Sequence, residues 1–136
     1  MAHILVIEDE PHIRFLTCKV LQTAGHTTAE AEDGMEGLHT LYRCPGEFDA
    51  VIMDVQMPKL DGYQLLDMLK RQPFAIPIIV LTSHRGLCQH FRERGAMGGL
   101  TKPVNRRQLL DLIDHLLNIP PDSASQRTTA NQFVHH

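Results

Sequence analysis

Two uninterrupted apolar runs that end in carboxylates constrain this chain more than any other feature. Residues 50–53 (Ala-Val-Ile-Met) precede Asp54, and residues 4–7 (Ile-Leu-Val-Ile) precede Glu8 and Asp9. Apolar runs without polar alternation are typical of parallel strands that are buried on both faces. Each acid therefore stands where a strand leaves the sheet. For Asp54 alone, two interpretations stay open, a residue that starts a turn or a reactive carboxylate.

Segments with helical periodicity alternate with the strands. Residues 77–81 predict a third strongly apolar strand, and residues 26–31 and 97–100 predict two weaker ones. Apolar stripes at helical spacing predict five helices. They lie at residues 11–24, at 34–43, around Leu65 to Leu69, at about 87–94, and around a stripe from Leu109 to Leu116 with Asn105 as N-cap.

Five strand–helix repeats predict an α/β fold, a flavodoxin-like doubly wound sheet of five parallel strands with five helices. The strongly apolar strands are the first, third and fourth, which occupy the centre of a sheet in the order 2-1-3-4-5. Ligands of such sheets bind beyond the carboxyl ends of the strands at the switch point, here between the first and third strands. The fold therefore predicts that Glu8, Asp9 and Asp54 lie together.

Composition excludes several classes of protein. A chain of 136 residues with 43% hydrophobic content suits one domain, which we expect at residues 1–118. From Pro120 the chain is polar and without periodicity, so residues 119–136 read as a disordered tail or a truncated linker. A net charge of −3 gives no reason to expect direct nucleic-acid binding. Three widely spaced cysteines, with no signal-like segment and no apolar run of about 20 residues, predict a cytoplasmic protein that does not span a membrane.

Three neighbouring carboxylates need a positive partner. At about 6 Å and an effective dielectric near 20, each pair repels by roughly 3 kcal/mol. Mg²⁺ meets the need, because it accepts carboxylates while keeping waters and a phosphate oxygen. Thr82 and Lys102 stand at the ends of the fourth and fifth strands, on the same rim. A metal, a lysine and a hydroxyl around one aspartate predict a receptor for a phosphoryl group on Asp54.

These residues resemble the receiver domains of bacterial two-component response regulators, of the chemotaxis type that consists of a single domain. The resemblance covers residues 2 to about 118. Five motifs in the right order at the right strand ends make it specific. They are Glu8-Asp9, Met-Asp54-Val-Gln-Met-Pro, Asp61-Gly62, Leu-Thr82-Ser and Lys102-Pro103.

The resemblance implies a role for each site residue. Asp54 is the expected nucleophile for a phosphoryl group, and Thr82 and Lys102 are expected to bind the phosphoryl oxygens. Asp9, Asp54 and the backbone carbonyl of Gln56 are expected to hold Mg²⁺, with Glu8 acting through a bound water. Such a domain catalyses only its own phosphorylation and dephosphorylation. The bond between Lys102 and Pro103 is expected to be cis.

The resemblance also implies partners. The phosphoryl donor is expected to be a histidine kinase or a histidine phosphotransfer protein that docks near the helix at 11–24 and near Val104. The downstream target is a protein that the sequence does not identify, and the chain is expected to be a monomer or weak dimer. The chain departs from the family pattern at one position that concerns signalling to the target. Gly99 stands where the family usually has an aromatic residue that swings inward.

Three alternatives compete with this interpretation. A phosphohydrolase of the haloacid dehalogenase type needs a second acid where this chain has Gln56, and 136 residues leave no room for its cap. A flavodoxin-like electron carrier would put a flavin phosphate where Glu8, Asp9 and Glu10 would repel it. A receiver that serves only as a docking module would lack a site residue, and Gly99 is the only departure in that direction.

Overall fold

The computed structural model describes residues 2–55, 62–71, 76–83 and 87–117. A single parallel sheet has the strand order β2-β1-β3-β4-β5, as predicted. Its strands are β1 (His3–Ile7), β2 (Thr27–Ala31), β3 (Ala50–Asp54), β4 (Ile78–Thr82) and β5 (Gly98–Thr101). The helices are α1 (Pro11–Thr23), α2 (Gly34–Arg43), α3 (Gly62–Lys70), α4 (Leu87–Glu93) and α5 (Arg106–Leu117).

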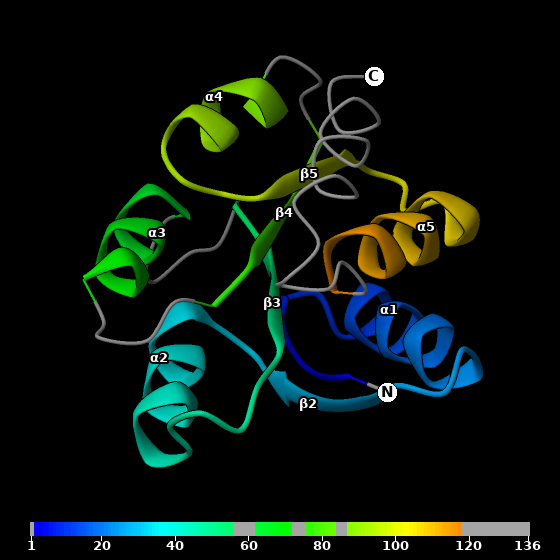
Figure 1. Ribbon diagram of the computed structural model, residues 1–136, viewed down its shortest axis with the longest axis horizontal. Coiled ribbons are helices and arrows are strands. Elements are labelled where there is room, and N and C mark those ends of the chain that lie inside the picture. Colours follow the sequence, from blue (N-terminus) through cyan, green and yellow to red (C-terminus); the bar gives the residue numbers. More distant parts are fainter. Residues whose placement is uncertain (1, 56–61, 72–75, 84–86, 118–136) are drawn as a thin grey trace, which may run out of the picture.

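The helices cover both faces of the sheet (Figure 1). Successive strand residues point to opposite faces, so the core divides into two clusters. Leu5 and Met53 pack with residues of α2, α3 and α4 on one face. Val6 and Ile52 pack with residues of α1 and α5 on the other face. This is the doubly wound arrangement that the sequence predicts.

The strands differ in burial as their composition predicts. Every residue of β3 and β4 is buried, whereas β2, at one edge, is partly exposed along most of its length. The register aligns Ile7 with Met53, and Asp54 with Leu81. The carboxyl ends of the central strands therefore meet at one edge of the sheet.

The helix termini explain how the chain leaves that edge. Glu10 is the N-cap of α1, where its carboxylate accepts hydrogen bonds from the amides of His12 and Ile13, and Pro11 occupies the first turn. Asn105 accepts a hydrogen bond from the amide of Gln108 at the start of α5, as predicted. The peptide bond between Lys102 and Pro103 is cis.

Some expectations fall outside this description. Gln56, Asp61 and the segment 119–136 lie outside the described residues. Within the described residues, each helix is too short or too polar to cross a bilayer.

Candidate functional site

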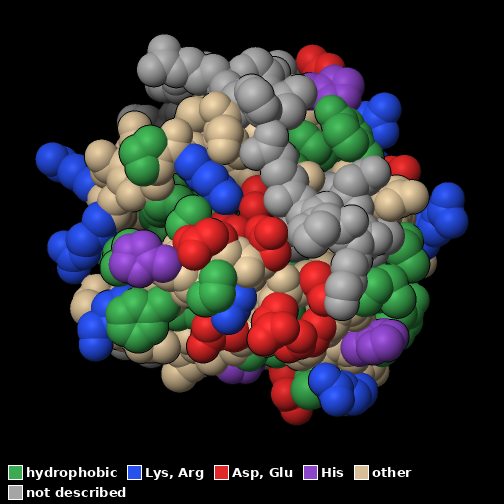
Figure 2. All heavy atoms as spheres, turned by 180° about the vertical axis from the view of Figure 1, so that it is seen from behind, with side chains coloured by type: hydrophobic (Ala, Val, Ile, Leu, Met, Phe, Trp, Pro, Cys, Tyr) green, Lys and Arg blue, Asp and Glu red, His purple; other side chains and the backbone are tan. Residues whose placement is uncertain are grey.

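Three carboxylates meet at the carboxyl edge of the sheet, as predicted. Glu8 and Asp9 follow β1, and Asp54 ends the neighbouring strand β3. A carboxylate oxygen from each residue lies within 4.8 Å of the others. Glu8 and Asp54 are buried, whereas Asp9 is exposed. Figure 2 shows acidic side chains gathered near the middle of one face, with basic side chains beside them.

Lys102 joins two of these carboxylates. Its Nζ lies 3.0 Å from Oε1 of Glu8 and 3.1 Å from Oδ2 of Asp54. The Lys102 backbone N–H donates to the Thr82 carbonyl at 2.7 Å, which holds the residue against the end of β4. The lysine ammonium therefore pairs with both buried carboxylates of the cluster.

Burial and charge act together on the ionisation of this cluster. Burial raises the pKa of Glu8 from 4.5 to about 7, the Lys102 ammonium opposes that rise, and the Asp54 carboxylate adds to it. For Lys102, burial lowers the pKa, but the Glu8 and Asp54 carboxylates outweigh it, and the net pKa lies above its ordinary value. Oε1 of Glu8 is buried with no aligned hydrogen-bond donor among the described residues, so Lys102 acts on it as an ion-pair partner.

Thr82 takes the position that the sequence predicts. It ends β4, is fully buried, and pairs in register with Thr101 of β5. The structure thus brings Glu8, Asp9, Asp54 and Lys102 into one cluster and places Thr82 at the adjoining strand end. The predicted ligand Gln56 stays untested.

Sequence reasoning missed two features of the site region. Arg14 lies on the helix that is expected only to dock the phosphoryl donor, yet its Nη1 donates to the backbone carbonyl of Glu8 at 2.7 Å. Tyr63 at the start of α3 stacks on Phe91 of α4, with ring centroids 4.5 Å apart. Neither contact has a signal in the sequence, because the first depends on how α1 turns back from β1 and the second on how α3 packs against α4.

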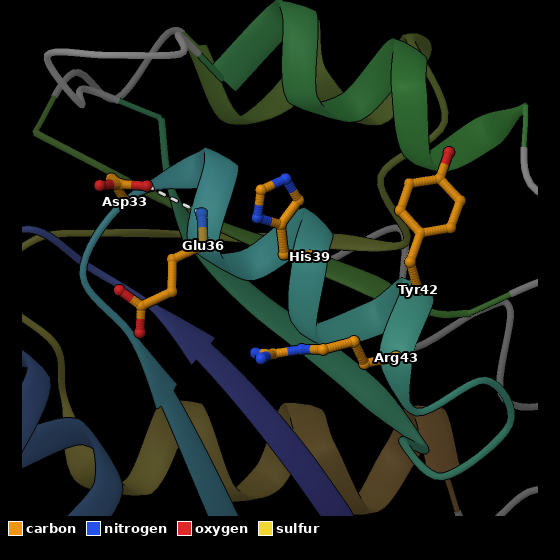
Figure 3. Close-up of a pocket in the computed structure, with 5 residues that line it drawn as sticks. All are labelled: Asp33, Glu36, His39, Tyr42 and Arg43. Carbon is orange, nitrogen blue, oxygen red and sulfur yellow. Dashed lines mark hydrogen bonds between the residues drawn. The ribbon is translucent and has the colours of Figure 1, made fainter.

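The described residues also form hollows outside the carboxylate cluster. One, of about 540 Å³, runs along the exposed side of α2 and is lined by Asp33, Glu36, His39, Tyr42 and Arg43. Figure 3 shows that these side chains point in different directions, and that the Asp33 carboxylate is engaged by the amide of Glu36. Because the side chains do not converge on one point, this hollow lacks the geometry of a reactive site.

The second hollow is an apolar groove of about 170 Å³ beside Lys102. It lies between α1 and the segment that leads into α5, and it is lined by Ile13, Leu16, Thr17, Val20, Lys102, Pro103 and Val104. The side chains of Phe15 and Leu16 on α1 are exposed by 61% and 48%. Leu16 also lines the groove, so its side chain and the groove form one apolar surface that borders Lys102.

Comparison with known proteins identifies the family. The family model of the response regulator receiver domain matches residues 4–114 of this chain. The transcriptional regulatory protein GlrR of Escherichia coli K12 is 32% identical over 128 residues, which cover 93% of this chain and 28% of GlrR. Protein PilH of Pseudomonas aeruginosa PAO1 is 32% identical over 121 residues, which cover 86% of this chain and 98% of PilH. The chain therefore spans under a third of GlrR and nearly all of PilH.

A solved structure agrees with this match. The receiver domain of the sensor histidine kinase PA1611 from Pseudomonas aeruginosa PAO1 was solved with a magnesium ion coordinated in its active-site cleft. It is 26% identical to this chain and superposes with a TM-score of 0.78. The superposition covers 87% of this chain and 98% of that domain. The matches favour a receiver over the phosphohydrolase and electron-carrier alternatives. The chain belongs to the response regulator receiver domain family of two-component signalling systems.

Proposed function

We propose that Asp54 is the phosphoryl acceptor of this receiver. The observation that carries the proposal is the Lys102 ammonium, which lies between the buried carboxylates of Asp54 and Glu8. A carboxylate oxygen of Asp54 attacks the donor's phosphorus and forms a new P–O bond. The bond from phosphorus to the donor's nitrogen or oxygen breaks, and its electron pair leaves with the donor, which takes up a proton.

Side chains of this chain would hold the transferred group. Lys102 turns from the Asp54 carboxylate to a phosphoryl oxygen, and the hydroxyl of Thr82 donates to another. Because the same two groups stabilise charge in the transition state, the domain accelerates its own phosphorylation and hydrolysis. The cation also keeps the buried anionic cluster stable before transfer.

The carboxylates fit a divalent cation. One carboxylate oxygen from each of Glu8, Asp9 and Asp54 lies within 4.8 Å of the others, and together they match the hard oxygen ligands that Mg²⁺ prefers. Asp9, Asp54 and the Gln56 carbonyl would hold the ion directly, and Glu8 would do so through water. Bound Mg²⁺ would neutralise the charge that builds up between the phosphoryl group and the carboxylates. The magnesium in the PA1611 receiver supports this choice of ion.

The donor is a histidine kinase or a histidine phosphotransfer protein. The apolar groove is lined in part by Lys102, so a helix of the donor that packs on Ile13 and Leu16 would bring its phosphohistidine toward the carboxylate cluster. Docking of this kind buries apolar surface that the chain otherwise exposes to water.

Phosphorylation of Asp54 would be signalled to a downstream protein through a change in α4. Because β5 has Gly99 in place of an aromatic residue, the Tyr63–Phe91 stack is the connection that we assign to the switch. Tyr63 lies just after the segment that follows Asp54, and Phe91 lies on the helix that follows Thr82. Rearrangement of either segment therefore changes the same buried aromatic contact, and a change there would shift α4, whose outer side a downstream protein would contact.

The remaining features follow from the sequence. We assign the receiver to residues 1–118, and residues 119–136 to a disordered tail or truncated linker. We expect a cytoplasmic monomer or weak dimer that does not bind nucleic acid directly.

Intact-mass analysis after incubation with acetyl phosphate and Mg²⁺ tests the proposal. We expect wild type to gain the mass of one phosphoryl group, and Asp54→Asn to gain none. Asp67→Asn removes an exposed carboxylate on α3 and should behave as wild type. Equal labelling of wild type and Asp54→Asn would overturn the proposal.

A further inference from the structure

The side chain of Arg14 connects three parts of the fold. Its Nη1 donates to the backbone carbonyl of Glu8 at 2.7 Å, and its Nε donates to Oε1 of Glu30 on β2 at 3.1 Å. Only 13% of the Arg14 side chain is exposed, compared with 54% of the Glu30 side chain. An ion pair with a partner so exposed contributes little stability, so the contact with the carbonyl is the more important one.

The backbone of Glu8 is held at both its N–H and its carbonyl. The N–H of Glu8 donates to the carbonyl of Ala31 on β2 at 3.1 Å, and its carbonyl accepts from Arg14. The Glu8 carboxylate in turn accepts from the amide of Glu10 at 3.3 Å. Arg14 thus fixes the carbonyl of a residue whose own side chain, and the side chain that follows it, belong to the carboxylate cluster.

We propose that Arg14 is a positioning residue, which orients the Glu8–Asp9 peptide so that both carboxylates face the metal ion. This inference rests on the proposed function, in which that ion is Mg²⁺. Arg14 is not itself a ligand, because its guanidinium is a cation. Groups that orient metal ligands from behind commonly change metal affinity by about 10- to 100-fold when they are removed.

The sign of the effect separates positioning from simple charge. A guanidinium near the site repels a divalent cation, so loss of its charge alone would strengthen Mg²⁺ binding. Loss of a positioning contact weakens binding, because the Glu8 carbonyl loses its donor and the peptide is free to rotate. Arg14→Met removes both the charge and the donor, whereas Arg14→Lys keeps the charge and one donor that can reach the carbonyl.

Two further variants serve as matched controls. Glu30→Gln removes the ion pair on the far side of the guanidinium and leaves the bond to the Glu8 carbonyl in place. Arg43→Met removes an exposed arginine on α2, distant in sequence from the cluster. Both should bind Mg²⁺ within about twofold of wild type, since surface ion pairs contribute little.

The experiment combines calorimetric titration of the whole chain with Mg²⁺ and amide hydrogen exchange of the metal-free protein. We expect Arg14→Met to bind Mg²⁺ about tenfold more weakly, Arg14→Lys to be intermediate, and the amides of Glu8 and Glu10 to exchange faster in Arg14→Met before any metal is added. Binding by Arg14→Met that equals or exceeds that of wild type would overturn the inference, as would unchanged exchange. Absence of binding by wild type would instead overturn the proposed metal site, and the metal-free exchange rates would still decide the role of Arg14.

Discussion

Nζ of Lys102 lies 3.1 Å from Oδ2 of Asp54, although the two residues are at the ends of different strands. The contact exists because β3 and β5 flank β4, and their carboxyl ends meet at the same edge of the sheet. In the proposed function, this contact pairs the nucleophile with a cation that would bind the transferred phosphoryl group.

Replacing Lys102 separates metal binding from phosphoryl transfer. In Lys102→Met the cluster keeps its three carboxylates and loses the cation that competes with Mg²⁺ for them, so we expect Mg²⁺ to bind at least as tightly as in wild type. Phosphorylation by acetyl phosphate should slow by about 100-fold or more, because a donor to the transferred group is lost. Calorimetry and intact-mass kinetics measure the two effects, and Lys19→Met is an exposed control on α1. Equal losses of binding and rate would contradict a phosphoryl-binding role for Lys102.

Glu8 should make both stability and metal affinity depend on pH. Its pKa in the folded, metal-free protein is about 7, against an ordinary value of 4.5. Between these values the folded state holds a proton that the unfolded chain has released, so the free energy of unfolding without metal should fall as the pH rises from 4.5 to about 7.

Metal binding should show the opposite trend. A protonated Glu8 lacks the charge that attracts Mg²⁺, so affinity should rise with pH up to about 7 and then level off. Mg²⁺ titrations from about pH 5 to about pH 8 test this expectation. In Glu8→Gln the rise of Mg²⁺ affinity with pH should disappear. An equal rise of Mg²⁺ affinity with pH in Glu8→Gln would show that another group causes the pH dependence.

The sequence predicts the fold well because the relevant information is local. The unbroken apolar runs of β3 and β4 predict buried strands, and the polar composition of β2 predicts an edge strand. Strand order then places Glu8, Asp9 and Asp54 together, since residues that end adjacent parallel strands share an edge.

Contacts between side chains of different elements are less predictable. The sequence does not show which acid caps α1: Asp is the more common N-cap, yet Glu10 caps α1 and Asp9 joins the cluster. The bounds of β5 also differ from the strand predicted at residues 97–100, because β5 spans Gly98–Thr101. Thr101 belongs to β5 because it pairs with Thr82 on the neighbouring strand, which a pattern within the segment does not reveal.

The Tyr63–Phe91 stack should couple α3 to α4 measurably. The rings lie 4.5 Å apart with an interplanar angle of 27°, Phe91 is fully buried, and Arg94 lies 4.8 Å from the centroid of the Tyr63 ring. A double-mutant cycle of Tyr63→Leu and Phe91→Leu should give a coupling free energy of about 0.5–1.5 kcal/mol in chemical unfolding.

The same variants test the output route. With beryllofluoride as a mimic of the phosphoryl group, wild type should show amide shifts near Asp54 and along α4. Tyr63→Leu should keep the former and lose most of the latter, whereas Tyr42→Leu, on the exposed side of α2, should keep both. Undiminished α4 shifts in Tyr63→Leu would rule out the aromatic contact as the connection.

The most direct test of the central claim identifies the residue that carries the phosphoryl group. Borohydride reduces an aspartyl phosphate to homoserine, so protein treated with acetyl phosphate and Mg²⁺ can be reduced, digested and mapped by mass spectrometry. We predict homoserine at position 54, dependent on Mg²⁺ and absent from Asp54→Asn. Modification at Glu8 or Asp9, or no modification of wild type, would contradict the claim that Asp54 is the acceptor.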